Sequence, residues 1–118
     1  MRIYCAGAYS ASNILDVFEN MRKGIRLSTE AFLAGYFVFC PFIDYHFALQ
    51  LRDGERLTIG DFYKYSLAWL EVSDAILLVP GWEDSVGTKA EIVKAGELGI
   101  PIFNSLEELK EKFPIAKE

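Results

Sequence analysis

A glutamate that follows a short stretch of small residues is the first candidate for chemistry. The segment is Ser85-Val-Gly87-Thr88-Lys-Ala-Glu91. Ser85 suits a helix N-cap, and Glu91, four residues beyond Gly87, lies on the same helix face and leans back toward the helix start. The unpaired N–H groups and positive dipole end there favour an anion, and we expect the same polarity to keep Glu91 ionised. Glu91 is then either a nucleophile or only a favourable charge near a helix start.

A second candidate lies near the N-terminus. The segment Gly7-Ala8-Tyr-Ser10-Ala-Ser-Asn13 consists mostly of small or polar residues and follows an apolar run. Small residues let a ligand approach the backbone closely. The same composition is also typical of a plain turn, so both interpretations stay open.

Strands and helices must hold these two loops together. Apolar runs bounded by glycine or proline predict strands at 2–6, 36–40, 75–79 and 100–103. Three-and-four spacing and capping residues predict helices over 14–34, 58–73 and 86–98, and one opening after Ser105. The first helix should bury the face with Ile14, Phe18, Met21, Ile25 and Phe32. Residues 42–57 fit no pattern.

Alternation of strands and helices predicts the fold class. We expect one domain over residues 1–118 with three layers, α/β/α, and a four- or five-stranded, mainly parallel sheet of the flavodoxin or Rossmann type. Ligands of such sheets bind beyond the carboxyl ends of the strands, beside the switch in strand order. The loops after the first and third strands are therefore where a site is expected.

Composition narrows the partners. The net charge is −5 and no Lys/Arg cluster occurs, which argues against a nucleic acid polymer. The N-terminal apolar run is too short for a signal peptide and no segment could span a membrane, so we expect a cytoplasmic protein. The contents of 52% hydrophobic and 14% aromatic residues predict a homodimer or higher homo-oligomer. His46 is the single histidine, and no metal-ligand spacing or cofactor motif is found.

Several segments together resemble a known family. They are Ile3-Tyr-Cys-Ala-Gly7, Asn20, Gly35-Tyr-Phe-Val-Phe-Cys-Pro41, Leu67-Ala-Trp-Leu-Glu-Val-Ser-Asp74 and Ser85-Val-Gly-Thr-Lys-Ala-Glu91 with the following Gly99-Ile-Pro. The chain is similar to the nucleoside 2-deoxyribosyltransferase superfamily, including its 2′-deoxynucleoside 5′-monophosphate N-glycosidases. The resemblance covers nearly everything except residues 42–57 and the C-terminal tail. Its most specific part is the Ser-x-Gly-x-x-x-Glu spacing.

The resemblance implies a mechanism and a set of site residues. Glu91 would attack the anomeric carbon of a nucleoside or nucleotide and form a glycosyl-enzyme that water or a second base releases. Tyr4 would lie beside the sugar. Ser85 matches a serine that contacts the 5′-phosphate in the monophosphate hydrolases, which favours a phosphorylated ligand. The other expected substrate contacts are Gly7, Ala8, Ser10, Phe42, Trp82, Gly87 and Thr88, and no cofactor is implied.

The chain departs from the family pattern at two places. Ser66 stands where the family usually has an aspartate, and either Asp61 or Asp44 is a candidate replacement. Ala8 and Ser10 replace a serine and an arginine beside the phosphate, which leaves Lys89 as the nearby positive charge.

Two aromatic residues have a double interpretation. Phe42 either stacks on a nucleobase or packs in the core, and Trp82 lies either at the pocket rim or in a subunit contact.

Two other functions remain in consideration. One is a non-catalytic nucleotide- or nucleotide-sugar-binding protein that kept the pocket without the aspartate. The other is a phosphoribohydrolase of the cytokinin-activating type, to which Val86-Gly-Thr-Lys-Ala-Glu91 is similar. The presence or absence of a second carboxylate beside Glu91 separates an enzyme from a binding protein.

Overall fold

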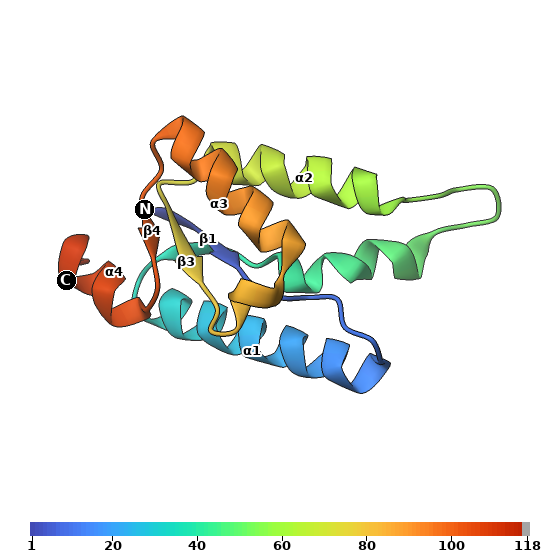
Figure 1. Cartoon of the computed structure of the whole chain (residues 1–118), viewed down its shortest axis with the longest axis horizontal. Helices are drawn as coiled ribbons and strands as arrows, with labels where there is room; N and C mark the ends of the chain where they lie inside the picture. The colour runs from blue at the N-terminus through green and yellow to red at the C-terminus, as the bar shows by residue number, and fades with distance from the viewer. Residues whose placement is uncertain (117–118) are drawn as a thin grey trace.

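The computed structural model describes residues 1–116, except for the side chain of Tyr45, and contains a four-stranded parallel sheet (Figure 1). Its strands are β1 (Arg2–Ala6), β2 (Phe37–Phe39), β3 (Ala75–Leu78) and β4 (Ile102–Phe103). They lie in the order β2-β1-β3-β4, and each neighbouring pair is parallel. The predicted α/β class with a parallel sheet is confirmed.

Four α-helices connect and cover the strands: α1 (Ile14–Leu33), α2 (Ile59–Glu71), α3 (Val86–Leu98) and α4 (Leu106–Lys112). Each begins at a polar N-cap whose side chain accepts a backbone N–H, namely Asn13, Thr58, Ser85 and Ser105. The segment that fitted no pattern forms a 3₁₀ helix, η1 (Pro41–Gln50), and a shorter one, η2 (Trp82–Asp84), precedes α3. Within the described residues, no helix is long and apolar enough to cross a membrane.

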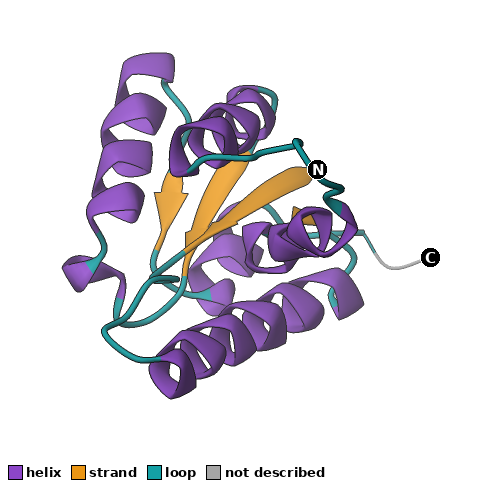
Figure 2. Cartoon of the chain, turned by 90° about the vertical axis from the view of Figure 1, so that its right-hand side faces the viewer, coloured by secondary structure: helices purple, strands orange, loops and turns teal. Residues whose placement is uncertain are grey.

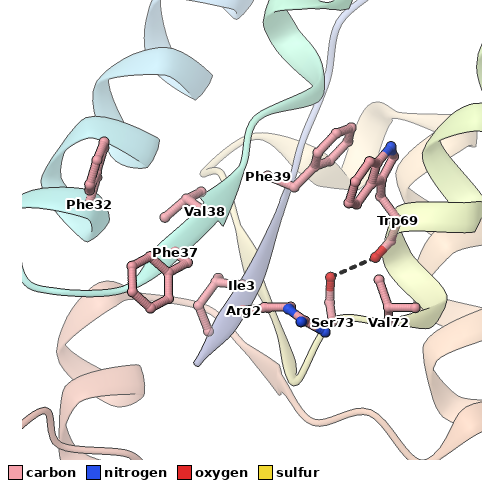
Figure 3. Close-up of a pocket in the computed structure, with 9 residues that line it drawn as sticks. All are labelled: Arg2, Ile3, Phe32, Phe37, Val38, Phe39, Trp69, Val72 and Ser73. Carbon is pink, nitrogen blue, oxygen red and sulfur yellow. Dashed lines mark hydrogen bonds between the residues drawn. The ribbon is translucent and has the colours of Figure 1, made fainter.

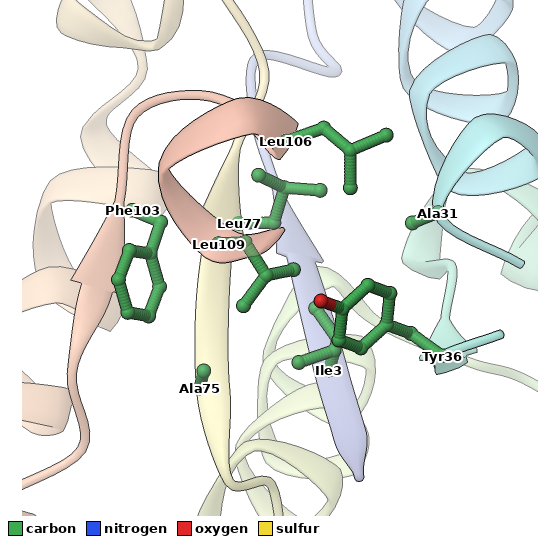
Figure 4. Close-up of a cluster of buried hydrophobic side chains, with 8 residues drawn as sticks. All are labelled: Ile3, Ala31, Tyr36, Ala75, Leu77, Phe103, Leu106 and Leu109. Carbon is green, nitrogen blue, oxygen red and sulfur yellow. The ribbon is translucent and has the colours of Figure 1, made fainter. Parts of the chain in front are cut away.

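Alternate side chains of the sheet pack into two layers. Ile3 and Leu77 face α1 and α4, where they join a cluster with Ala31, Leu106 and Leu109 (Figure 4). Tyr4 and Ile76 face the opposite side, where Leu70 of α2 and Ala95 of α3 cover them. Figure 2 shows the sheet between these two groups of helices. Burial of both faces explains why β3 is an uninterrupted apolar run.

The buried face of α1 differs from the predicted one. The helix buries Met21, Gly24, Ser28 and Ala31. Of the predicted stripe only Met21 is buried, whereas Ile14, Phe18, Ile25 and Phe32 are exposed. Small side chains face inward because α1 lies close to the sheet and to η1. Helical spacing of large residues predicted the helix correctly but its orientation wrongly.

Close packing of Phe42 on Gly24 yields a stability prediction. A Cβ atom at Gly24 would clash with the Phe42 ring, whereas the space around Gly96 of α3 is open. We expect Gly24→Ala to lower the free energy of unfolding by about 1–3 kcal/mol through overpacking. Gly96→Ala should instead raise it by about 0.5–1 kcal/mol because alanine favours the helix. Urea denaturation of both variants tests this, and equal effects would contradict the packing of Phe42 on Gly24.

Candidate functional site

A cleft of about 470 Å³ lies beyond the carboxyl ends of β1 and β3. From β1 the chain continues to β2 on one side of it, and it later returns to β3 on the other side. The switch in strand order therefore lies between β1 and β3. The structure brings together most residues that the sequence predicted for a site: Tyr4, Gly7, Ser10, Phe42, Ser85, Gly87, Thr88 and Glu91 line this one cleft. Ala8, Asp61 and Trp82 are not among the lining residues.

The carboxyl group of Glu91 is buried next to the hydroxyl of Tyr4. Tyr4 comes from β1 and is almost completely buried. Its hydroxyl forms side-chain hydrogen bonds with Glu91 and with Ser66 of α2. The Oε2 atom of Glu91 is buried and has no hydrogen-bond partner among the residues that the structure describes. A buried polar atom without a partner is costly, and in a cleft it marks a place where a ligand atom is expected.

Burial raises the pKa of Glu91 from 4.5 to about 7, and the hydrogen bond from Tyr4 only partly opposes this. This corrects the expectation that helix polarity keeps Glu91 ionised. Glu91 is the sixth residue of α3, and the dipole effect fades within the first turn. Desolvation therefore dominates, and Glu91 changes its protonation state in the neutral pH range instead of near pH 4.5. Burial and the nearby Glu91 charge likewise raise the pKa of Tyr4, which stays a hydrogen-bond donor.

The start of α3 is built around Ser85. Its Oγ accepts the N–H of Thr88 at 3.2 Å and the Thr88 hydroxyl at 2.9 Å, and its carbonyl accepts the N–H of Lys89 at 3.1 Å. Gly81 turns the chain toward this helix with φ of +93°, a conformation that favours glycine. The Ser85 hydroxyl proton remains available, and the N–H groups of Val86 and Gly87 are the first two of the helix. This edge of the cleft therefore offers donors to a ligand.

The first-strand loop also has a structural reason for its small residues. A Cβ atom on Gly7 would lie 2.6 Å from Cβ of Val79, so the glycine lets the loop pass close to the residue that follows β3. The side-chain amide of Asn20 donates to the carbonyl of Tyr9 at 3.3 Å and ties the loop to α1. Phe42 is buried and stacks against Tyr9, with ring centroids 6.3 Å apart. Phe42 is thus packed in the core and also lines the cleft, and its stacking on a nucleobase stays a prediction.

Asp61 and Trp82, like Ala8, lie outside the lining of the cleft. The Asp61 carboxylate accepts hydrogen bonds from the N–H of Thr58 at 2.8 Å and from its hydroxyl at 3.0 Å, which completes the predicted capping box. These hydrogen bonds lower the pKa of Asp61, so a capping role replaces the expected role as a substitute acid. Trp82 is partly buried against the core layer that contains Tyr4 and Ala95, and does not line the cleft.

The cleft also contains residues that the sequence alone did not bring together. Ile59, Phe62 and Tyr63 of α2 face it and, with Phe42, give it an apolar wall. Asp44 of η1 lines it too, and partial burial raises the pKa of its carboxyl group. Asp44 was one of two candidate replacements for the missing aspartate, but no pattern in residues 42–57 favoured it over Asp61. In the sequence, only the apolar residues at the start of the helix predicted over 58–73 could have indicated this apolar wall of the cleft.

Three carboxyl groups, those of Asp44, Asp84 and Glu91, line the cleft. No lysine, arginine or histidine is found among its described lining residues, and Lys89 is not one of them. Across residues 1–116, excluding the Tyr45 side chain, no three His, Cys, Asp or Glu side chains are placed to hold a metal ion. The cleft is thus acidic at one edge, apolar at another, and able to donate hydrogen bonds from the start of α3.

A second cavity of about 350 Å³ lies at the edge of the sheet (Figure 3). Phe32, Phe37, Phe39, Trp69 and Val72 make it largely apolar, and the Ser73 hydroxyl beside it donates to the carbonyl of Trp69 at 2.8 Å. It contains no nucleophile or acid of the kind found in the cleft. The expected self-association stays a prediction, for which the exposed side chains of Phe32, Phe37 and Trp69 are one candidate surface.

Comparison with known proteins gives a fold and a family. The structure is similar to that of a 2-deoxyribosyltransferase from the psychrotolerant bacterium Bacillus psychrosaccharolyticus, with a TM-score of 0.57 and 21% sequence identity. The match covers 86% of this chain and 69% of that one, and shows a shared fold. A comparison with curated proteins gives no match. Residues 1–104 match the family described as "Domain of unknown function (DUF4406)", and the chain therefore belongs to the DUF4406 family.

Proposed function

We propose that the protein cleaves the N-glycosidic bond of a nucleoside or nucleoside 5′-monophosphate, with Glu91 as nucleophile and Tyr4 in support. The observation that carries this proposal is the buried Oε2 atom of Glu91, which has no hydrogen-bond partner within the described part of the chain; Glu91 itself lines the cleft at the strand switch. The fold shared with a 2-deoxyribosyltransferase supports it, as does the resemblance at Ser85, Gly87 and Glu91.

The proposed reaction has two steps. An ionised Glu91 oxygen attacks C1′ of the sugar, the C1′–N bond breaks, and its electron pair leaves with the base. Water, or the nitrogen of a second base, then attacks C1′ and displaces the Glu91 carboxylate. The Tyr4 hydroxyl keeps Glu91 oriented by its hydrogen bond throughout. Both steps need C1′ next to Glu91, which places the sugar at the floor of the cleft.

The two walls of the cleft suit the two ends of such a substrate. The apolar wall of Phe42, Ile59 and Phe62 favours a flat nucleobase. The polar edge with Asp84, Ser85 and the first N–H groups of α3 favours the sugar hydroxyls. A cleft of about 470 Å³ falls in the range of small-molecule sites.

Two alternatives receive less support. A binding protein without catalysis needs no second carboxyl group, whereas Asp44 lines the cleft together with Glu91. A salt bridge between Glu91 and Lys89 would have favoured binding without catalysis, but Glu91 forms its hydrogen bond with Tyr4. A phosphoribohydrolase of the cytokinin-activating type needs an arginine partner, and none is among the described lining residues.

The direct test is release of free base from a panel of ribo- and deoxyribonucleosides and their 5′-monophosphates. The proposal expects release from at least one of them, detected by chromatography, and transfer when a second base is added. Binding without release, measured by calorimetry with the same panel, would support the non-catalytic alternative. No release and no binding would contradict the proposal.

The charges of the cleft predict which half of this panel reacts. A phosphate dianion would enter a cleft lined by Asp84 and by the reactive carboxylate of Glu91, with no cation among the described lining residues to offset their negative charge. We therefore expect kcat/KM for a nucleoside to exceed that for its 5′-monophosphate by about 10-fold or more, because 1–2 kcal/mol of repulsion suffices. This replaces the preference for a phosphorylated ligand inferred from Ser85. Asp84→Asn should bring kcat/KM for the nucleoside and for its 5′-monophosphate closer together. A higher kcat/KM for the monophosphate in the unaltered protein would contradict the prediction.

A further inference from the structure

Asp44 is the carboxyl group that the 3₁₀ helix η1 adds to the cleft. It is partly buried, and its segment also supplies Pro41, Phe42 and Ala48 to the same wall. Asp84, in contrast, precedes Ser85 at the start of α3, where the sugar hydroxyls are expected. Of the two aspartates, Asp44 is thus the one on the side of the nucleobase.

Asp44 is also electrostatically coupled to the reaction centre. Its charge contributes to the raised pKa of the Tyr4 hydroxyl, the same hydroxyl that hydrogen-bonds Glu91 and Ser66. It contributes in the same direction to the pKa of Cys40, which lies at the end of β2 next to η1. Charges affect each other in this way only over short distances. Asp44 and Glu91 line the same cleft as Tyr4, and both charges raise the pKa of the Tyr4 hydroxyl.

A nucleobase is a poor leaving group unless a proton reaches it as the bond to C1′ breaks. Ser66, the polar side chain that contacts Tyr4, does not release a proton at neutral pH. Tyr4 itself is held as a hydrogen-bond donor to Glu91 by its raised pKa. Asp61 is bound in the capping box of α2. Among the described lining residues, Asp44 is the carboxyl group on the side of the base.

We propose that Asp44 is the general acid that protonates the departing nucleobase and then the general base that activates the attacking water. This rests on the proposed function above and adds a catalytic residue from a segment outside the resemblance. In the first step the Glu91 oxygen bonds to C1′, the C1′–N electron pair moves to the base, and the proton of Asp44 neutralises it. In the second step Asp44 takes a proton from water, whose oxygen bonds to C1′ as the bond to Glu91 breaks. Both carboxyl groups return to their starting states.

The reaction requires Asp44 protonated and Glu91 charged, which is the minor arrangement in the free protein because burial raises the pKa of Glu91 to about 7 and that of Asp44 by less. Burial raises the pKa of Asp44, and a nucleobase against the apolar wall removes more water from it. The Tyr4 hydrogen bond stabilises the charged form of Glu91.

The experiment compares leaving groups in Asp44→Asn, which keeps the size and polarity of the side chain. One substrate pair is 2′-deoxyguanosine and its 7-methyl derivative, whose base leaves as a neutral molecule without added protons. A pyrimidine pair is 2′-deoxyuridine and its 5-fluoro derivative, a better leaving group. We expect Asp44→Asn to lower base release from the unmodified member by about 10²- to 10⁴-fold and to change the activated member by only a few-fold.

The controls separate this role from others. Asp53→Asn, in an exposed turn outside the cleft, should leave both rates unchanged. Asp44→Ala with added formate should recover part of the lost rate on the unmodified member. Equal losses on both members of a pair would show a structural or binding role, and no loss on either would show no role; both overturn the proposal. Absence of base release by the unaltered protein would instead reject the proposed function itself.

Discussion

Replacing Glu91 with glutamine is expected to abolish base release. Glutamine has the size and hydrogen-bonding ability to keep the contact with Tyr4, but its amide cannot form the bond to C1′. Removal of a nucleophile costs on the order of 10⁴- to 10⁶-fold in rate. Chromatography of the released base, with the best substrate from the panel, measures the loss.

Glu97→Gln is the matched control, because Glu97 lies on the same helix and is exposed. It should retain full activity. Mass spectrometry after rapid acid quenching supplies a second readout, in which the unaltered protein gains one sugar unit on the peptide that contains Glu91. Glu91→Gln should show no such adduct. Base release that persists in Glu91→Gln would rule out covalent catalysis by this residue.

Glu91→Gln should also remove a loss of stability that the unaltered protein shows as the pH rises. The pKa of Glu91 is 4.5 when unfolded and about 7 when folded, so between these values the folded protein holds a proton that the unfolded chain releases. The contribution of Glu91 to stability is therefore complete below pH 4.5 and is lost as the pH rises through 7. The shift corresponds to about 3 kcal/mol in the free energy of unfolding. Glutamine does not titrate and lacks this loss.

Urea denaturation of both proteins between pH 4 and 8.5 tests this prediction. The difference in unfolding free energy, unaltered protein minus Glu91→Gln, should fall by about 3 kcal/mol across that range. Contributions from other groups, such as Asp44, largely cancel in the difference. A difference that stays constant with pH would mean that Glu91 is not desolvated in the folded protein. We expect Glu91→Gln to be inactive but more stable than the unaltered protein at pH 8, because a buried carboxylate that serves catalysis lowers stability.

Local sequence patterns predicted the elements well. Ser85 caps α3 and Thr58 with Asp61 caps α2, because a capping box involves residues only three positions apart. The parallel sheet followed from the alternation of apolar runs and helices, and the location of the cleft followed from the parallel sheet. The grouping of Tyr4, Ser85 and Glu91 in one cleft was likewise predicted, with help from the family resemblance.

The errors concern contacts between distant segments. The large apolar residues of α1 predicted its inward face, but the closeness of Phe42 to Gly24 selects the side with small residues. Asp61 lies on a helix that lines the cleft, but its carboxylate accepts a hydrogen bond from the N–H of Thr58 in the capping box. Neither outcome is encoded in the spacing of the residues concerned, because each depends on which segment packs nearby.

The loop-to-helix segment from Gly81 to Glu91 has some properties that the local sequence determines and others that only the tertiary structure determines. Its turn, its cap and the position of Glu91 on α3 depend on neighbours in the chain, so the sequence was sufficient for them. The raised pKa of Glu91 depends on burial against β1 and on Tyr4, eighty-seven positions earlier in the chain. The position of Asp44 in the cleft depends on the path of η1, whose sequence has no helical or strand-like spacing of apolar residues. Desolvation and long-range packing arise only when the whole chain is folded, and these set the chemistry of the cleft.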